Sequence, residues 1–420
     1  MRILDENNIE NFLEDIEYEN IESVKDILID VKQNGDSAVR KYSYEFDKME
    51  FDENSTFEIS EEEIKNALNS IDEKTLDAIK KAIKNIQKFA KTQLKSIKEL
   101  KIKEKGSIVG HKITPIESVL CYAPGGGYPL PSSAIMTVAV AKVAGVKNIY
   151  LTSPKIHSAT IVAGHLAGTN KIFKIGGVQA IGAFAYGTKS LPKVDKIVGP
   201  GNKFVTGAKK EVYGLVDIDF LAGPSEVLVV ADETANPELI SADLLAQCEH
   251  DKDARGYLIT TSKKLAQDVK NCALKQLENL KTKEIAKISF EKSIAIVVDS
   301  IEKAIELSNK RAPEHLEVMI KDEKKYINKF TNYGSLFIGN NCAEVFGDYC
   351  TGTNHVLPTN KVARYRGGLS VFDFIKIQTY QKISKKYGLE LSKIASELAK
   401  TEGLMAHKLA SDLRGKNNEN

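Results

Sequence analysis

The segment Leu244-Leu-Ala-Gln-Cys-Glu-His-Asp251 contains two polar side chains that could bind a metal or a substrate at one point. It follows a strand-like run from Val227 to Asp232 and a helix start at Asn236-Pro237, where asparagine suits the cap and proline the first turn. Gln247 and His250 are three residues apart, so they share one face of a helix. A histidine near a helix end is more often a capping or solvated residue, so this pair alone only suggests a site.

A second polar pair, Glu314 and His315, stands where Pro313 ends a predicted helix and a strand begins at Leu316. A carboxylate beside an imidazole can act as an acid and base couple, because burial and the two charges shift both pKa values toward neutral pH. From the residues alone, a pair exposed on the surface is an equally good interpretation.

The other histidines are weaker candidates. His407 lies in the polar motif Glu402-Gly-Leu-Met-Ala-His, whereas His355 is expected only to shape its loop. We expect the remaining three to be structural or surface residues: His111, His157 and His165.

Three glycine-rich loops each follow a predicted strand: Pro124-Gly-Gly-Gly-Tyr128, Gly176-Gly-Val-Gln-Ala180 and Gly199-Pro-Gly-Asn202. None of them has the Gly-x-Gly-x-x-Gly pattern with a distant acidic residue that is typical of dinucleotide-binding sheets. Each loop alone would be read as a tight turn. Three of them at the carboxyl ends of parallel strands indicate an edge where backbone N–H groups bind phosphates.

Composition excludes several classes of protein. The 420 residues carry 59 basic and 57 acidic side chains, a net charge of +2, so no strong field would attract nucleic acid or a membrane surface. The N-terminus lacks the pattern of a secretory signal, and lysines interrupt the most apolar region, 134–151. Five cysteines without a Cys-x-x-Cys spacing suggest reduced thiols. We therefore expect a cytoplasmic protein.

The alternation of strand and helix patterns predicts an α/β fold with two Rossmann-like parallel-sheet lobes. We expect a short N-terminal arm at 1–21, a discontinuous first lobe at 22–121 and 227–368, and a second lobe at 122–226. Residues 369–420 have an almost entirely helical pattern and predict a helical C-terminal tail.

Several motifs occur in the order and spacing of the histidinol dehydrogenase family, which the chain resembles from about residue 110 to 411. These motifs are Ala222-Gly-Pro-Ser-Glu226, Gln247-Cys-Glu-His250, Arg311-Ala-Pro-Glu-His-Leu-Glu317, Gly347-Asp-Tyr, Gly352-Thr-Asn-His-Val-Leu-Pro358, Glu402-Gly-Leu-Met-Ala-His407 and the three glycine loops. Two departures are mild: Cys248 replaces a commoner alanine, and the tip of the first loop reads Gly125-Gly-Gly-Tyr. The first hundred residues resemble the family mainly in length and helical pattern.

The resemblance implies one zinc ion per subunit, held by residues that match Gln247, His250, Asp348 and His407. The pocket for L-histidinol, on the side of the first lobe, would comprise these four ligands together with Ser225, His315 and Glu402. The contacts to NAD, on the side of the second lobe, would be made by Tyr122, Gln179 and Asn202.

The reaction implied is the four-electron oxidation of L-histidinol to L-histidine through L-histidinal, with two hydride transfers to NAD, in the last steps of histidine biosynthesis. His315 would remove the hydroxyl proton, and Glu314 would activate the water that attacks the aldehyde. The tail reaches the active site of the partner subunit in this family, so a homodimer with exchanged tails is implied, without nucleic-acid or membrane partners.

Three other functions stay open. A related zinc- and NAD-dependent dehydrogenase could act on a sulfonated diol, although the presence of Ser225 and Glu402 favours histidinol. A zinc hydrolase would need the Glu-His pair and the metal but would leave the glycine loops without a role. A non-catalytic binding protein would leave the whole set of motif residues unused.

Overall fold

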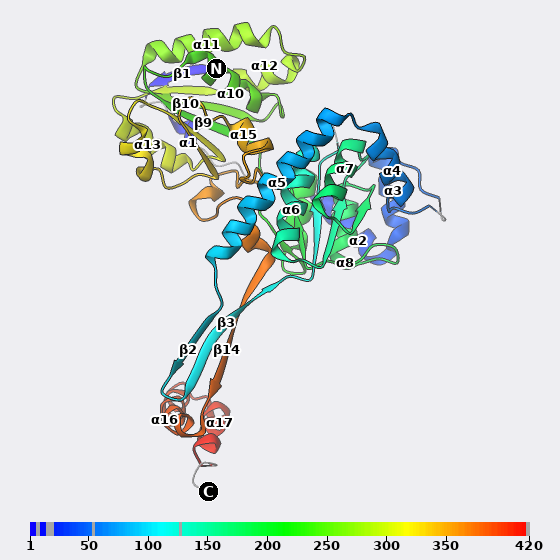
Figure 1. Ribbon diagram of the computed structural model, residues 1–420, viewed down its shortest axis with the longest axis vertical. Coiled ribbons are helices and arrows are strands. Elements are labelled where there is room, and N and C mark those ends of the chain that lie inside the picture. Colours follow the sequence, from blue (N-terminus) through cyan, green and yellow to red (C-terminus); the bar gives the residue numbers. More distant parts are fainter. Residues whose placement is uncertain (6–8, 14–20, 53–54, 126–127, 417–420) are drawn as a thin grey trace.

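The structure of the protein is a computed structural model that describes residues 1–5, 9–13, 21–52, 55–125 and 128–416. It contains two α/β lobes and an arm that projects away from both of them (Figure 1). Each lobe has a parallel sheet covered by helices on both faces, so the predicted α/β fold with two parallel sheets is confirmed. The tip of the first glycine loop, at 126–127, lies outside the described residues.

The first lobe contains six parallel strands in the order β1-β11-β10-β9-β12-β13. The strands are β1 (Arg2–Asp5), β9 (Glu226–Ala231), β10 (Arg255–Thr260), β11 (Ile294–Val297), β12 (His315–Met319) and β13 (Ser335–Ile338). One face is covered by α10 (Pro237–Cys248), α11 (Lys263–Leu277) and α12 (Lys283–Lys292). The other face is covered by α1 (Glu10–Leu13), α13 (Ile301–Arg311), α14 (Glu323–Tyr326) and η1 (Ile327–Lys329).

The N-terminal residues belong to this lobe rather than to a separate arm. β1 pairs in parallel with β11 at the edge of the sheet, and Phe12 of α1 is fully buried. An edge strand of four residues needs only a short apolar patch, here Ile3 and Leu4, which is too brief to give a periodic signal in the sequence.

The second lobe contains five parallel strands in the order β6-β5-β4-β7-β8. The strands are β4 (Ser118–Tyr122), β5 (Asn148–Thr152), β6 (Lys171–Phe173), β7 (Lys196–Val198) and β8 (Asp217–Ile218). One face is covered by α4 (Glu61–Ser70), α5 (Glu73–Ser96), α6 (Pro131–Ala144) and α7 (Ser158–Ala167). The other face is covered by α2 (Glu22–Asn34), α3 (Asp36–Asp47), α8 (Gly177–Tyr186) and α9 (Lys203–Val212).

The helices of residues 22–96 thus pack on the second lobe, contrary to the prediction that 22–121 belong with 227–368. α2 approaches α8 closely where Gly182 has no side chain, since a Cβ there would lie 2.9 Å from Leu28 Cδ2. An amphipathic pattern shows that one face of a helix is buried, but it does not show which sheet that face covers.

The arm is a three-stranded antiparallel sheet that carries the C-terminal helices. Its strands lie in the order β14 (Ile375–Ile383), β3 (Ser107–Pro115), β2 (Leu100–Glu104), and its tip holds α16 (Lys385–Thr401) and α17 (Met405–Lys416). The prediction that 369–420 is helical therefore missed β14, although Ile375, Ile377 and Ile383 alternate as in a strand.

The segment between β13 and the arm joins the two lobes. It contains α15 (Glu344–Tyr349), η2 (Val362–Arg364) and η3 (Val371–Phe374). Asn85 of α5 donates to the carbonyl of Cys350 at 2.7 Å, and Asn354 donates to the carbonyl of Met136 in α6 at 2.8 Å. These bonds hold the residues that follow α15 against the second lobe.

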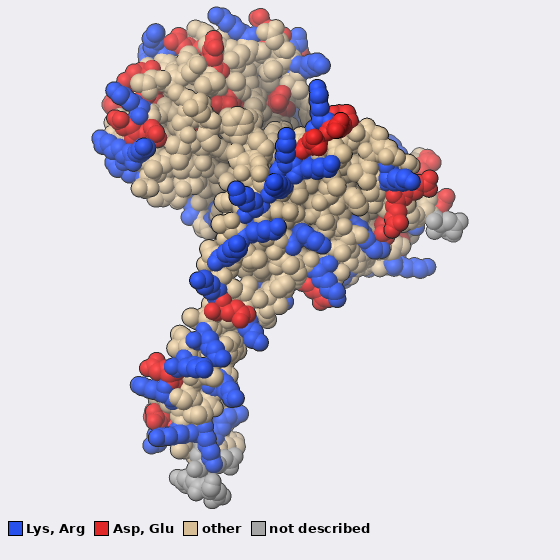
Figure 2. All heavy atoms as spheres, in the orientation of Figure 1, with Lys and Arg blue, Asp and Glu red and all other residues tan. Residues whose placement is uncertain are grey.

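Lysines and arginines gather along α5 and on the arm, with acidic side chains between them on the arm (Figure 2). Within the described ranges, no helix has the length and apolar character needed to cross a membrane.

Candidate active site

The predicted polar residues of the first lobe meet at the amino edge of its sheet. Glu226 is the first residue of β9 and His315 the first of β12, and these strands are neighbours. α10 and α13 run back to the same edge, so Gln247 lies at the end of one and Glu314 follows the other. Because helix carboxyl ends carry partial negative charge, this edge favours a cation.

The backbone of Glu226 holds both members of the predicted acid and base pair. Its N–H donates to Glu314 Oε2 at 2.9 Å, and its carbonyl lies 3.1 Å from His315 Nδ1. A carbonyl can only accept, so Nδ1 carries a hydrogen, and Nε2 is the nitrogen left to exchange a proton. Both side chains are buried, which excludes the alternative of an exposed surface pair.

Asp348 of α15 faces the free nitrogen of His315. Its Oδ1 lies 3.4 Å from His315 Nε2, and neither atom makes a hydrogen bond within the described part of the chain. The ring of Phe337 stacks on His315 with centroids 6.1 Å apart. α15 can lie this close to Phe337 because residue 347 is glycine, since a Cβ there would be only 2.6 Å from the ring.

Burial and the neighbouring charges shift the pKa values of Glu314, His315 and Asp348. Burial raises the pKa of Glu314 to about 7, even though His315 and the Glu226 N–H favour its charged form. Burial alone would lower the pKa of His315, but the carboxylates of Glu314 and Asp348 raise it well above its ordinary value. Burial opposes ionisation of Asp348 too, yet the contact with His315 keeps its pKa below the ordinary value.

Two further histidines lie around Asp348. His355 Nδ1 is 3.0 Å from the carbonyl of Asp348, and both His250 and His355 act electrostatically on the Asp348 carboxylate. His250 is exposed and lies just beyond the end of α10. His355 was expected only to shape its loop. It lies seven residues after Asp348, and this spacing does not indicate that the chain brings its side chain back to the site.

Gln247 is completely buried and firmly oriented. In the amide orientation that satisfies both of its groups, its nitrogen donates to Glu344 Oε1 at 3.1 Å and its oxygen accepts from the Glu226 N–H at 2.8 Å. The neighbouring Cys248 points elsewhere, with its sulfur 3.6 Å from Ser293 Oγ. Burial raises the pKa of this thiol, so Cys248 is not a poised nucleophile.

A buried carboxyl cluster, comprising Asp243, Glu317 and Glu344, lies behind Gln247. Glu317 Oε1 accepts from the Glu344 N–H at 2.8 Å, and the carboxyls of Asp243 and Glu317 interact electrostatically. Burial raises the pKa of Asp243 to about 6 and that of the two glutamates well above the ordinary value. This cluster was not predicted from the sequence, because Glu317, the last residue of the motif that begins at Arg311, is distant from Glu344 and no pattern links the two.

The three predicted glycine loops meet at the carboxyl edge of the second sheet. The Tyr122 hydroxyl accepts from the Gly177 N–H at 3.1 Å, which joins the first and second loops. Gly199 has a φ of +115° and packs against the carbonyl of Tyr122, which joins the first and third. β4 is flanked by β5 and β7, and the strand order reverses there, as at dinucleotide sites of doubly wound sheets.

The predicted cofactor residues differ in their surroundings. Gln179 is buried, its Nε2 lies 3.4 Å from Asp47 Oδ2, and its Oε1 has no hydrogen-bond partner in the described ranges. Asn202 is exposed and caps α9 by accepting from the N–H groups of Phe204 and Val205. A buried ion pair missed in the sequence, Lys209 with Asp219, anchors Gly199 through both its carbonyl and its N–H.

Two predicted residues lie far from this group in the same chain. Glu402 and His407 are exposed near the junction of α16 and α17, at the end of the arm that is remote from both lobes (Figure 1). Ser225, in contrast, directly precedes Glu226 at the site. Among the residues that the structure describes, no three His, Cys, Asp or Glu side chains of one chain form a metal cluster. One chain thus brings Gln247, His250 and Asp348 together without His407.

Comparisons with known proteins agree on one family. The family model described as histidinol dehydrogenase matches residues 13–415. The histidinol dehydrogenase of Methanocaldococcus jannaschii is 48% identical over 390 residues, covering 92% of this chain and 90% of that protein. That of Clostridium acetobutylicum is 44% identical, with 92% and 90% covered. A crystal structure of histidinol dehydrogenase from Elizabethkingia anophelis matches 100% of this chain and 99% of its own, with a TM-score of 0.94 and 38% identity.

The carboxyl cluster predicts an unusual dependence of stability on pH. The folded chain holds the Asp243 proton up to about pH 6, whereas the unfolded chain loses it near 3.8, so this group makes stability fall as pH rises between these values. Asp243→Asn removes the effect. We expect the metal-free variant to be more stable than the wild type at pH 8 by roughly 1–2 kcal/mol, and no more stable at pH 4.

Urea unfolding at both pH values measures this difference. Asp268→Asn, on the exposed side of α11, is the matched control and should behave alike at both. A loss of stability at pH 8 in Asp243→Asn would mean that the ionised cluster is stabilising instead.

Proposed function

The chain belongs to the histidinol dehydrogenase family, and from this premise we propose that it oxidises L-histidinol to L-histidine through L-histidinal, with NAD as hydride acceptor. The observation that carries the proposal is the pair Glu314 and His315, both buried and both held by the backbone of Glu226. Within histidine biosynthesis, this enzyme would catalyse the last steps.

The first oxidation requires a base at the alcohol. His315 has its Nδ1 hydrogen bonded to the carbonyl of Glu226, so Nε2, in its unprotonated form, is the atom that accepts the hydroxyl proton. As that proton leaves, a hydride passes from the carbinol carbon to NAD, and the C–O single bond becomes a carbonyl. The proton on Nε2 then faces the carboxylate of Asp348, which stabilises the imidazolium.

The second oxidation requires water as a nucleophile. The pKa of Glu314, about 7, lets it accept a proton from water near neutral pH. The resulting hydroxide adds to the aldehyde carbon, and the hydrate loses a second hydride to a second NAD. The product is the carboxylate, so one histidinol and one water yield two NADH and three protons. No thiol is needed, in keeping with the buried Cys248.

The donor set suits a zinc ion that binds the substrate. The buried Oδ1 of Asp348 lacks a hydrogen-bond partner within the described ranges, and the amide of Gln247 and the exposed ring of His250 lie at the same sheet edge. We propose that these three residues and His407 hold the metal. When bound, zinc would take the imidazole and amine nitrogens of histidinol and orient the alcohol.

The second lobe suits NAD. The meeting point of the glycine loops at the β4 and β7 ends presents backbone N–H groups and helix N-termini to a pyrophosphate. We propose that Tyr122, Gln179 and Asn202 contact the cofactor. The unpartnered Oε1 of Gln179 is a polar atom that such a contact would satisfy.

A homodimer with exchanged tails would complete the site. The arm carries Glu402 and His407 away from the body of their own chain, and α16 and α17 expose Leu398, Met405 and Leu409. We propose that these helices pack on a second copy, where Glu402 and His407 join Ser225 at the substrate. We also propose the cytoplasm as the compartment, in keeping with five free cysteines.

The decisive test is the number of NADH molecules formed per L-histidinol at limiting substrate, with and without a zinc chelator. We expect two, and loss of both on chelation. One NADH would remove the role of Glu314 in a second step. Formation of no NADH would favour one of two other functions: a dehydrogenase that acts on a sulfonated diol, or a zinc hydrolase.

Glu314→Gln should separate the two oxidations. The amide still accepts from the Glu226 N–H, so the geometry is kept while the base is lost. We expect oxidation of added histidinal to fall roughly 10²- to 10⁴-fold and the first NADH from histidinol to fall less than tenfold. Rapid-mixing measurements of each half-reaction test this, with His315→Asn as the matched variant that should impair the alcohol step. Equal losses in both half-reactions would contradict the division of roles.

Mixed dimers should reveal whether the tails are exchanged. His315→Asn disables the body of one chain and His407→Ala the tail of the other, so each homodimer is inactive. If tails cross, the mixed dimer regains one intact site, and co-expression restores about one quarter of the wild-type sites. Purification of the mixed dimer by two different tags, followed by histidinol turnover and zinc analysis, measures this. No recovery in the mixed dimer would mean that each tail serves its own chain.

A further inference from the structure

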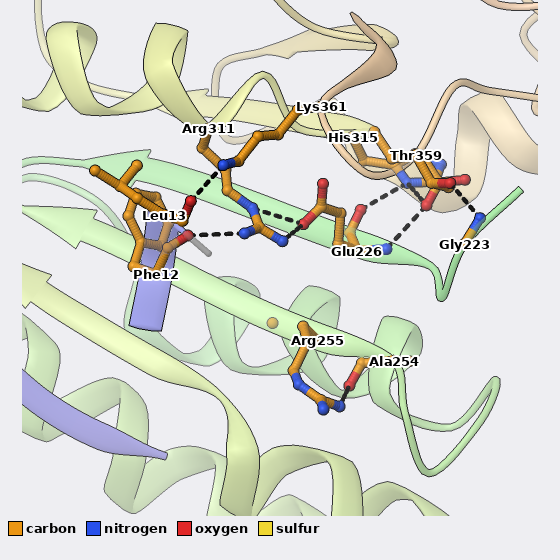
Figure 3. A network of polar contacts seen from close by, with 12 residues as sticks. Phe12, Leu13, Gly223, Glu226, Ala254, Arg255, Arg311, His315, Thr359 and Lys361 are labelled. Carbon is orange, nitrogen blue, oxygen red and sulfur yellow. Dashed lines mark hydrogen bonds and ion pairs between the residues drawn. The ribbon is translucent and has the colours of Figure 1, made fainter. Parts of the chain in front are cut away.

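A buried ion pair supports the backbone that holds Glu314 and His315. Arg311, at the end of α13, donates from Nε to Glu226 Oε2 at 2.9 Å, and its Nη2 donates to the same oxygen. The two side chains are only 3% and 1% exposed, so water does not compete for these bonds. Figure 3 shows the pair beside His315, with the Glu226 backbone between them.

The N-terminal segment completes this contact. Arg311 Nη1 donates to the carbonyl of Phe12 at 2.7 Å, and its guanidinium lies 4.7 Å from the ring centre of Tyr257 and 5.7 Å from that of Phe12. The two rings pack edge to face, with centroids 5.2 Å apart. Lys361 donates to the next carbonyl, that of Leu13 (Figure 3). The two aromatic rings therefore hold the plane of the guanidinium, and the Phe12 carbonyl of α1 holds its Nη1 end.

These contacts close a loop through the catalytic pair. Glu314 follows Arg311 by three residues, and the intervening Ala312 has a φ of +50°, which residues with a side chain rarely adopt. The other end of Glu314 is held by the Glu226 N–H, and the Glu226 side chain returns to Arg311. A strained turn of this kind persists where the surrounding contacts over-determine it. Moving Arg311 would therefore move both the chain and the carboxylate of Glu314.

We propose that Arg311, Glu226 and α1 form a positioning unit that sets the orientation of Glu314 and His315, so that the N-terminal residues serve the active site from behind the sheet. The inference rests on the proposed oxidation of histidinol. Arg311 and Phe12 touch no reacting atom in it; they act through the Glu226 peptide groups. A buried ion pair is in general weak evidence for stability. A pair with fixed hydrogen-bond directions can nevertheless hold one peptide plane in the orientation that catalysis needs.

Substitutions at Arg311 test the unit in the intact enzyme. In Arg311→Met we expect kcat to fall roughly 10- to 100-fold, with KM for histidinol changed less than threefold and zinc content unchanged. Arg311→Lys should recover part of the loss, because one ammonium can reach Glu226 but cannot also hold the Phe12 carbonyl. Both half-reactions should fall together, because the Glu226 N–H and carbonyl serve both catalytic residues.

Arg255→Met is the matched control. Arg255 lies on β10 in register with Glu226, and its guanidinium donates to two nearby carbonyls, that of Asp253 at 2.6 Å and that of Ala254 at 2.8 Å, the second of which is drawn in Figure 3. The substitution removes the same charge from the same lobe, and kcat should stay within twofold of the wild type.

A second pair of variants separates the positioning of the guanidinium from the stability of the lobe. Phe12→Ala and Phe330→Ala each remove a buried phenylalanine from the same core, and both should lower the melting temperature. Only Phe12→Ala should also lower kcat, because only its segment holds the guanidinium. Equal kcat values for the two variants at a temperature where both are folded would overturn the proposal.

Chemical labelling tests the positioning without the reaction. Diethyl pyrocarbonate acylates imidazoles, and mass spectrometry can compare the buried His315 with the exposed His165 in each protein. We expect labelling of His315 relative to His165 to rise severalfold in Arg311→Met and not in Arg255→Met. Unchanged labelling together with unchanged kcat would refute the unit. A wild type that forms no NADH would instead refute the proposed function, while the labelling still decides the positioning.

Discussion

The structure depends most on the two peptide groups at Glu226. One N–H and one carbonyl, both at the first residue of a central strand, orient the imidazole that begins the neighbouring strand and the carboxylate that directly precedes it. Because β9 lies between β10 and β12 in the sheet, these groups are as fixed as the sheet itself. The same residue is linked to Gln247 by its N–H and to Arg311 by its side chain, so the proposed metal ligand, the proposed bases and the buried ion pair all depend on Glu226.

The two lobes present opposite edges of their sheets. In the second lobe, the glycine loops follow the carboxyl ends of strands, which is where ligands of parallel sheets usually bind. In the first lobe, the polar residues precede the strands, and α10 and α13 point their carboxyl ends at them. The proposed cofactor phosphate and the proposed metal ion would thus each meet helix ends of the appropriate sign.

Local sequence was sufficient where the physics is local. The apolar runs predicted most strands and helices of both sheets, although not the short β1, and Glu314 and His315 lie together, with His315 Nδ1 3.6 Å from Glu314 Oε2. The sequence pattern of a single element does not show which distant element it packs against. The amphipathic helices of 22–96 could cover either sheet, and Glu344, Arg311 and His355 reach the site only through tertiary contacts. His407 could not be placed from its own chain at all, because its proposed partners lie in another copy.

The pairing of distant segments also sets the order in which a newly made chain can become functional. β1 pairs with β11, about 290 residues later in the chain, and β14 pairs with β3 to complete the sheet of the arm. Contacts so remote in sequence form late, and during synthesis they wait until the last partner leaves the ribosome. The N-terminal strand therefore spends most of translation without its neighbour, and the arm closes only after the second lobe is complete. The proposed assembly with a second copy through the tail would then follow release of the finished chain.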